Sequence, residues 1–575
     1  MKALSRLLMA AAMTISTPAL AQSAIGDWQG TLDAGGTRLR LVVHITQSGE
    51  GGLTGTSDSP DQGAYGMPLA EISTEAETLA FTVPSVGARY SGKWNAAGKS
   101  WEGEFRQGGF AAPLVFVAAS PPEPLPANWT PPADEAIERL IAARLAGRNG
   151  QGLVVGVIEP QGRRVVTGDP AAGGPFSADT VFEIGSITKV FTALLLADMA
   201  NKGEVSLDEP AETYLPEGAR MPGRGGSKIT LADLATHTSS LPRLPDNMPF
   251  GDPADPYADY TEALLLAFLA GHELQSDIGA KWDYSNFGVG LLGYLLGRAA
   301  GSDYETLLRE RITGPLGMTD TSIALSAGQQ ARLAPGFDMY MRPAAPWHLP
   351  ALAGAGAIRS TTGDLLKFAQ AALDPASPIG AAMKTALSVR RTTGDPRFDQ
   401  ALGWQVAHPE PGRDILTHNG GTGGFRSALT LEPARERAVV VLANSAAEPS
   451  ATDLALHVLI GAPVAPTPPV PPAPPPAVAR TQITLPAAEL ERVVGRYEFA
   501  PGVVFVVTRD GKTVRARREG EVAGPVLEIF PDAPLSFFWK AVDAQVRFTT
   551  DESGEVTGAV FTQSGATLIG KRVEH

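Results

Sequence analysis

The stretch Phe182–Gly203, FEIGSITKVFTALLLADMANKG, joins a small hydroxyl side chain to a strongly apolar helical pattern. From Ile187 onward apolar residues recur at helical spacing, which predicts that a buried helix begins just after Ser186. Ser186 and Lys189 then lie one turn apart on the same face of that helix. The stretch therefore predicts an apolar helix packed in the core of a mixed domain, with a hydroxyl and an amine at its first turn.

This pair could do chemistry or could be structural. The free backbone N–H groups and the positive dipole at a helix N-terminus favour negative charge that develops there. A buried lysine loses hydration and feels the same dipole, so its pKa falls and it can accept a proton from the hydroxyl of Ser186. Alternatively, Ser186 is only a helix cap, because a Ser-x-x-Lys spacing also arises by chance.

A second polar pair precedes another apolar helix, in AKWDYSNFGVGLLG. Tyr284 and Asn286 alternate in a turn, so both side chains can point the same way. A phenol beside an ammonium can act as a general base, and an amide can hold both the lysine and a substrate carbonyl. We therefore treat Tyr284 and Asn286 as candidate site residues.

A third stretch, LTHNGGTGGFRSALTLE, opens a glycine-rich passage into an alternating strand. His418 and Gly420 stand at its start. Glycines there let a substrate backbone lie along an edge strand. The main-chain N–H at about Gly421 could complete an oxyanion hole with that of Ser186.

Together, these motifs resemble those of a known family, the penicillin-recognising serine hydrolases related to class C β-lactamases. The resemblance rests on three signatures in one order: Ser186-x-x-Lys189, Tyr284-x-Asn286 and His418-x-Gly420. The surrounding segments ITLADLATHTSSLP and AGAIRSTTGDLLKFAQAAL are also similar to that family. The group includes DD-peptidases, D-aminopeptidases and esterases, and its fold is an antiparallel sheet flanked by helices.

The resemblance implies a mechanism. Ser186 would attack a carbonyl and become an acyl-enzyme, while Lys189 and Tyr284 share the transfer of its proton. Asn286 would bind the amide oxygen of a small-molecule or peptide substrate, and His418 would lie near a substrate carboxylate.

One residue departs from the lactamase pattern. β-Lactamases of this group carry a lysine where this chain has His418, and a histidine is only partly charged near neutral pH. We therefore favour a peptidase or esterase over a dedicated β-lactamase. The alternative is a non-catalytic penicillin-binding or sensor protein that retains the fold.

Composition excludes other classes of function. The chain has 575 residues (60.0 kDa), 43% of them hydrophobic, which is enough for roughly two to four packed domains. A formal charge of −14 without a long basic run would repel polyphosphate, so no nucleic acid partner is expected. Cysteine is absent and the eight histidines lack metal-binding spacing, so we expect no disulfide, no metal and no cofactor.

The organisation along the chain is α+β at the centre and all-β at both ends. The start combines a basic segment, a short apolar run and the small-residue exit Ala19–Ala21, which predicts a signal peptide cleaved after about Ala21 rather than a membrane anchor. The protein is then periplasmic or secreted, with no stable membrane span. The predicted parts are a signal peptide 1–21, an all-β domain 24–119, a Pro-rich linker 120–133, a serine hydrolase domain 134–461, a Pro-rich linker 462–484 and a β-barrel-like domain 485–575.

The two end domains are predicted to be all-β because apolar and polar residues alternate along their segments. Leu39, Leu41, Val43 and Ile45 share one face of a strand, and Asp510–Gly511 marks a two-residue turn between two further strands. The Pro-rich linkers are expected to be extended and to bury nothing. The C-terminal domain could border the active site or support a homo-oligomer.

Three further signals have structural interpretations. A Gly-x-Gly-x-x-Gly pattern at Gly288, Gly290 and Gly293 lies inside an apolar helix, so it is interpreted as close helix packing rather than as a dinucleotide site. His237 is interpreted as a structural hydrogen-bonding residue at a helix end. Ser240 occupies a turn where the family usually has glycine.

Overall fold

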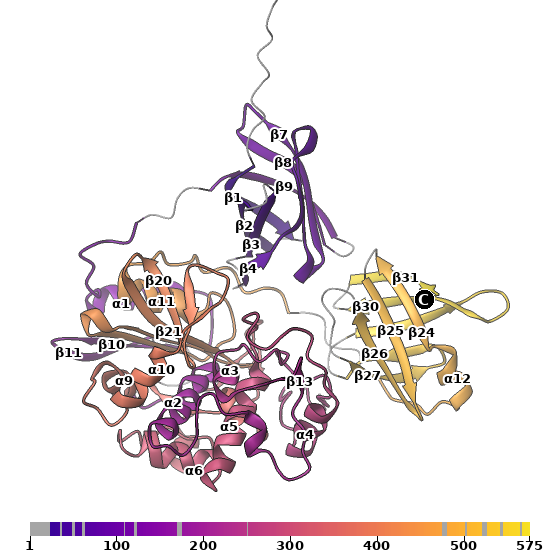
Figure 1. Cartoon of the computed structure of the whole chain (residues 1–575). Coiled ribbons are helices and arrows are strands. Elements are labelled where there is room, and N and C mark those ends of the chain that lie inside the picture. The colour runs from indigo at the N-terminus through magenta and orange to yellow at the C-terminus, as the bar shows by residue number, and fades with distance from the viewer. Residues whose placement is uncertain are drawn as a thin grey trace, which may run out of the picture. The chain divides into compact units, whose positions relative to one another are not determined.

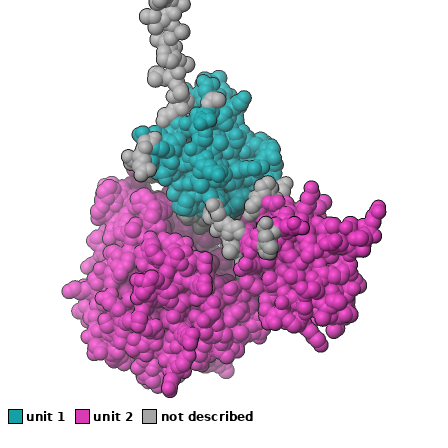
Figure 2. Space-filling view, turned by 45° about the vertical axis from the view of Figure 1, so that its right-hand side comes forward, with its two compact units in different colours: residues 1–121 teal, residues 122–575 magenta. Residues whose placement is uncertain are grey.

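The computed structural model describes residues 24–34, 37–48, 52–59, 64–107, 110–119, 124–168, 175–249, 251–473, 480–500, 503–519, 526–540, 544–563 and 566–574. The chain divides into two compact units, Met1–Pro121 and Pro122–His575 (Figure 2). The predicted signal peptide lies outside the described residues. Among the helices that are described, none is both long and apolar enough to cross a membrane.

The first unit is a nine-stranded antiparallel sheet in the order β4-β3-β2-β1-β9-β8-β7-β6-β5. Its strands are β1 Gly26–Ala34, β2 Thr37–Gln47, β3 Leu53–Ser59, β4 Ala64–Pro68, β5 Ala70–Ser73, β6 Thr78–Val83, β7 Ala88–Asn95, β8 Ser100–Gln107 and β9 Phe110–Ala118. Leu41, Val43 and Ile45 of β2 are buried in its core, as their alternation predicts. The unit is all-β.

The second unit contains an eight-stranded antiparallel sheet in the order β11-β10-β23-β22-β21-β20-β19-β18 (Figure 1). Its strands, in that order, are Gly162–Gly168, Leu153–Glu159, Arg437–Ala443, Arg426–Glu432, Arg413–Gly421, Gln405–Glu410, Phe398–Gln400 and Arg391–Thr392. Both faces of strand β10 are buried in a hydrophobic core, and the residues on both faces are accordingly apolar. Val154 and Ile158 belong to one core cluster, while Val155 and Val157 belong to another.

Helices cover the two faces of this sheet (Figure 1). α1 and α11 complete the smaller core cluster, whereas α2, α5 and α9 belong to the larger one. The helices of this part are α1 Asp134–Leu145, α2 Thr188–Asn201, α3 Leu231–Ala235, α4 Glu262–Gly271, α5 Asn286–Ala300, α6 Tyr304–Leu308, α7 Ala327–Gln330, α8 Ala353–Gly356, α9 Thr362–Leu373, α10 Gly380–Ser388 and α11 Ala451–Ile460. The predicted α+β class is confirmed.

Short strand pairs complete this part of the chain. β12 Val181–Glu183 pairs with β17 Arg359–Thr361, and it leads directly into the 3-10 turn η4, Gly185–Ile187, and then into α2. The other pairs are β13 Gly223–Arg224 with β14 Ser227–Lys228, and β15 Gly336–Phe337 with β16 Pro343–Ala344.

The C-terminal strands form a closed antiparallel barrel preceded by α12, Ala487–Arg492. The strands are β24 Gly495–Ala500, β25 Val503–Asp510, β26 Thr513–Glu519, β27 Leu527–Ala533, β28 Ser536–Phe538, β29 Ala544–Thr550, β30 Val556–Gln563 and β31 Ala566–Val573. Asp510 pairs with Thr513, so the turn is Gly511–Lys512 and the prediction was one residue early. Gly511 has φ +58°, the left-handed value that this hairpin needs.

Described parts of both Pro-rich stretches pack against the α+β part of the second unit, to which they belong. The indole N–H of Trp129 donates to the Val458 carbonyl at 3.1 Å, and Arg437 donates to the Trp129 carbonyl at 2.8 Å. Further along, Arg148 donates to the Pro468 carbonyl at 2.9 Å. The prediction that these stretches bury nothing is therefore wrong. The Trp129 indole and the main-chain carbonyls of Trp129 and Pro468 form hydrogen bonds to the rest of the domain.

Candidate active site

Ser186 lies in the turn η4, where strand β12 passes into helix α2, and its side chain is half-buried. The turn depends on Gly185, whose φ is +50°. A Cβ atom on Gly185 would lie 2.7 Å from the backbone nitrogen of Gly421, so a larger residue would clash. Glycine thus allows the turn that carries the hydroxyl to lie directly against β21.

Lys189 follows one turn later in α2 and is completely buried. Its Nζ atom lies 3.0 Å from Ser186 Oγ and donates to the Ala355 carbonyl at 2.7 Å. Burial, and then the positive charge of Arg243, lower the pKa of Lys189 well below 10.5. The amine is therefore poised to lose its charge beside the hydroxyl.

Tyr284 lies over this pair, in the segment that leads into α5. The centroid of its ring is 5.0 Å from Lys189 Nζ, and its phenol shares a hydrogen bond with Ser186. Burial raises the pKa of Tyr284 to about 12, although the hydrogen bond and the charge of Arg243 oppose this shift. The phenol thus keeps its proton near neutral pH, which disfavours the predicted role as a resting base.

Asn286 begins helix α5, and Ser285 caps this helix by accepting the Gly288 N–H at 2.8 Å. The Asn286 amide forms a hydrogen bond with the hydroxyl of Tyr257. Sequence reasoning missed Tyr257, which lies in a loop that carries no motif. The tyrosine thus holds the amide that the sequence predicts will bind a substrate carbonyl.

His418 lies on β21, and only 1% of its surface is exposed. Its Nδ1–H donates to the Asn419 carbonyl at 2.7 Å, and its ring centroid is 6.5 Å from that of Tyr284. Burial, and then the nearby Lys189, lower the pKa of His418 to about 4. The imidazole is therefore mostly neutral near pH 7, which disfavours the predicted role of His418 beside a substrate carboxylate.

Gly420 and Gly421 let strand β21 approach the serine turn. A Cβ atom on Gly420 would lie 1.9 Å from the Ile184 carbonyl oxygen. Ser427, opposite Gly420 on β22, donates its hydroxyl to the same carbonyl at 2.8 Å. The structure thus brings together the three stretches that carry the predicted site residues, although they are far apart along the chain.

His237 contacts this site more closely than expected. Its Nδ1 accepts the Ser285 N–H at 3.1 Å and its carbonyl accepts the Asp283 N–H at 2.8 Å. These bonds confirm the structural interpretation of His237. In addition, its ring centroid lies 4.4 Å from that of Tyr284, so the imidazole packs against the phenol ring.

The two remaining signals are explained by packing. A Cβ atom on Gly290 would lie 2.7 Å from Leu352, and one on Gly293 would lie 2.9 Å from Gly354, so these glycines serve close packing of α5 against α8. Ser240 has φ +62°, a conformation that favours glycine. Its hydroxyl compensates by a hydrogen bond with Ser276, at 2.8 Å between the oxygens. Within the described residues, no group of three or more His, Asp or Glu side chains is arranged to hold a metal ion.

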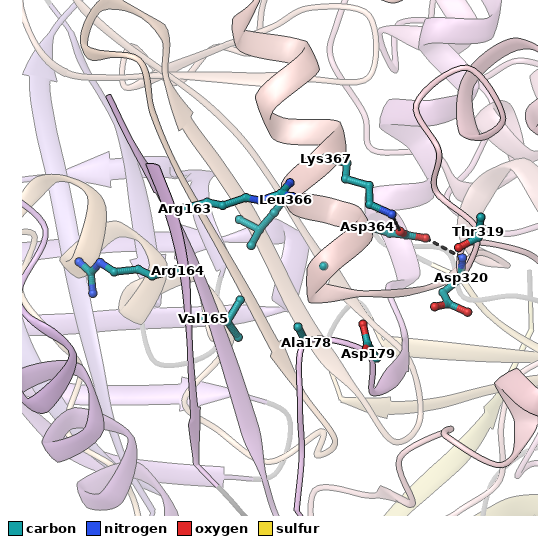
Figure 3. Close-up of a pocket in the computed structure, with 11 residues that line it drawn as sticks. Arg163, Arg164, Val165, Ala178, Asp179, Thr319, Asp320, Asp364, Leu366 and Lys367 are labelled. Carbon is teal, nitrogen blue, oxygen red and sulfur yellow. Dashed lines mark hydrogen bonds and ion pairs between the residues drawn. The ribbon is translucent and has the colours of Figure 1, made fainter. Parts of the chain in front are cut away.

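A separate surface pocket of about 440 Å³ lies beside β11 and α9 (Figure 3). None of the predicted site residues lines it. Its central carboxylate, Asp364, accepts from Lys367 at 2.7 Å and from the Asp320 N–H at 2.7 Å. These polar groups therefore bond to one another, and we assign them a structural role.

A family model and the sequences of characterised relatives identify one family. A family model described as Beta-lactamase matches residues 137–462. The chain is 34% identical over 283 residues to the D-alanyl-D-alanine-carboxypeptidase/endopeptidase AmpH of Escherichia coli (strain K12), which is 46% of this chain and 72% of that protein. It is 28% identical over 270 residues to a beta-lactamase of Lysobacter lactamgenus, 45% of this chain and 66% of that protein. The crystal structure of a beta-lactamase/D-alanine carboxypeptidase from Yersinia pestis aligns with a TM-score of 0.48 at 27% identity, over 54% of this chain and 92% of that chain.

Proposed function

Because the chain belongs to the beta-lactamase family of serine hydrolases, we propose that it hydrolyses a peptide amide, an ester or a β-lactam through an acyl-enzyme on Ser186. The observation that carries this proposal is the distance of 3.0 Å between Ser186 Oγ and the Nζ atom of buried Lys189. The name of the Escherichia coli relative supports a peptide substrate. An acidic residue is not needed to activate this serine, because a neutral amine can itself take the proton.

The proposed steps start from the neutral form of Lys189 and the protonated form of Tyr284. One N–H of neutral Lys189 remains bonded to the Ala355 carbonyl, while the nitrogen lone pair accepts the proton of the Ser186 hydroxyl. The oxygen then attacks the substrate carbonyl and forms a tetrahedral intermediate. When the bond to the leaving group breaks, Tyr284 passes a proton to that group and regains one from Lys189. Water attacks the resulting acyl-enzyme by the reverse sequence of proton transfers.

Different groups would bind the reacting carbonyl of the substrate and the amide next to it. The main-chain N–H groups of Ser186 and Gly421 would bind the oxyanion, and the contact between Gly185 and Gly421 supports this arrangement. Asn286 would bind the amide oxygen of the substrate. Both oxyanion donors are main-chain N–H groups, so they are in position before negative charge develops on the carbonyl oxygen.

We favour a peptidase or esterase over a dedicated β-lactamase. The support comes from His418, whose lowered pKa of about 4 leaves it uncharged where a β-lactam carboxylate would be bound. We also propose that the enzyme is exported, on the basis of the signal-peptide pattern in residues 1–21.

The direct test is covalent labelling of the purified chain with a fluorophosphonate and with a fluorescent penicillin. We expect a single adduct in the peptide that contains Ser186, identified by mass spectrometry after digestion. An adduct on another residue would refute the assignment of the nucleophile. No adduct with either reagent, in a sample shown to be folded by circular dichroism, would favour the non-catalytic binding protein.

The pH dependence of acylation gives a second test. Because only the neutral amine of Lys189 can accept a proton, acylation should be slow at low pH and should rise as pH passes the pKa of this lysine. That pKa lies well below 10.5, whereas Tyr284 keeps its proton up to about 12. We therefore expect one ascending limb, centred well below 10.5, in stopped-flow measurements of labelling. A midpoint at the ordinary lysine value would contradict the proposed base.

A further inference from the structure

Arg243 presents an exposed positive charge at the candidate site. Its guanidinium carbon lies 5.2 Å from the centroid of the Tyr284 ring, and its side chain is exposed. Within the described part of the chain, this guanidinium makes no ion pair and no side-chain hydrogen bond. It therefore remains free to bind an anion, in a protein whose formal charge is −14.

The backbone of Arg243 is held firmly beside Asn286. The Arg243 carbonyl accepts the N–H of Asn286 at 3.1 Å and that of Phe287 at 3.2 Å. The hydroxyl of Ser285 donates to the preceding carbonyl, that of Pro242, at 2.7 Å. The root of the arginine side chain is therefore fixed at the N-terminus of α5, next to the amide that we propose binds the substrate.

The other basic side chains near the predicted site residues are less suited to anion binding. Lys189, His237 and His418 are all buried, and burial lowers the pKa of each, so each is a poorer cation for a substrate than the exposed Arg243. Arg426, near Gly421, is half-buried and already donates to two backbone carbonyls at 3.3 Å. The charge of Arg243 is thus the one most available to a substrate.

We propose that Arg243 selects substrates that carry a carboxylate next to the amide held by Asn286, that is, acidic peptides or acidic N-acyl amino-acid derivatives. A guanidinium binds a carboxylate through two parallel hydrogen bonds, which gives direction as well as charge. This inference rests on the proposed function of the site and names its substrate class. It assigns anion recognition to an arginine on the loop between α3 and α4, at the Asn286 side of the site.

The test uses two thioesters of N-acyl-D-alanine that have the same shape but different charge. One carries an N-succinyl group, which ends in a carboxylate, and the other an N-succinamoyl group, which ends in a carboxamide. We expect kcat/KM to be about tenfold or more higher for the charged thioester. The difference should appear mainly in KM, and it should shrink as salt is added.

Four variants assign the preference to a residue. Arg243→Gln should bring the ratio of the two kcat/KM values close to one, and Arg243→Lys should leave an intermediate ratio. Arg426→Gln should keep the ratio, and so should Arg163→Gln, an exposed arginine on β11 that lines the separate pocket (Figure 3). A ratio that survives in Arg243→Gln, or that is lost in Arg426→Gln alone, would overturn the proposal.

The neutral thioester separates this inference from the proposed function. Turnover of the neutral thioester without a preference for the charged one refutes the role of Arg243 and leaves the acyl-enzyme proposal intact. Failure to turn over either thioester, together with no adduct on Ser186, refutes the proposed function itself.

Discussion

The variant Ser186→Ala should form no adduct with a fluorophosphonate or a penicillin, and its turnover of any substrate should fall by at least about 10⁴-fold. The expected loss is this large because the alanine side chain has no oxygen to form the acyl-enzyme. The main-chain donors near Gly421 and the Lys189 side chain would remain, so substrate binding should persist. Turnover is measured with an activated ester, and binding by calorimetry with a slowly hydrolysed substrate analogue.

A matched control for this variant is Ser388→Ala, at the exposed end of α10. Its hydroxyl donates to the Thr385 carbonyl at 2.8 Å, far from any proposed site residue in sequence. The control should label and turn over substrate as the parent does. Labelling of Ser186→Ala at an unchanged rate would show that the nucleophile lies elsewhere.

Replacing Lys189 with methionine should slow acylation by about 10²-fold or more, while the protein remains folded. The reason is the loss of the only nitrogen placed 3.0 Å from the serine hydroxyl among the described residues. Methionine fills a similar volume, and removing a poorly hydrated amine from the interior costs little where an apolar side chain replaces it. The rate is measured by stopped-flow labelling, and the fold by thermal unfolding. The ascending pH limb should disappear in this variant.

Lys202→Met is the matched control, because Lys202 caps the other end of the same helix α2. Its ammonium is exposed and pairs with Asp198 at 2.7 Å, a contact that contributes at most about 1 kcal/mol. Acylation should therefore be unaffected. If Lys189→Met acylates within about threefold of the parent, the proton must leave by another path, and Tyr284 becomes the candidate.

Much of this fold can be predicted because it depends on residues that lie close together in the sequence. The alternation of Leu41, Val43 and Ile45 predicts a half-buried strand because the side-chain period of a strand is two. The helix after Ser186 and the relation of Ser186 to Lys189 follow from helical spacing alone. The Asp-Gly pair also predicts the hairpin near Gly511 to within one residue, since such pairs favour two-residue turns.

Contacts between distant segments could not be predicted in this way. The charge state of His418 depends on burial by residues from several elements, so a pattern of neighbours along the chain does not reveal it. The same holds for the contact of His237 with Tyr284, and for Arg243, which belongs to no motif. A weak signal for His237 existed in its position after α3, but that signal did not indicate an aromatic partner.

The packing of Trp129 has a practical consequence for isolating the catalytic part of the chain. A Cβ atom on Gly461 would lie 2.8 Å from the indole of Trp129, so the entry and exit of this part of the chain lie side by side. Trimming to 134–461, the limits that composition suggests, would remove the indole and leave α11 without its cover. A version that retains residues 124–473 keeps the contact between the two ends. Ends that lie close together are also what circular permutation of an enzyme requires.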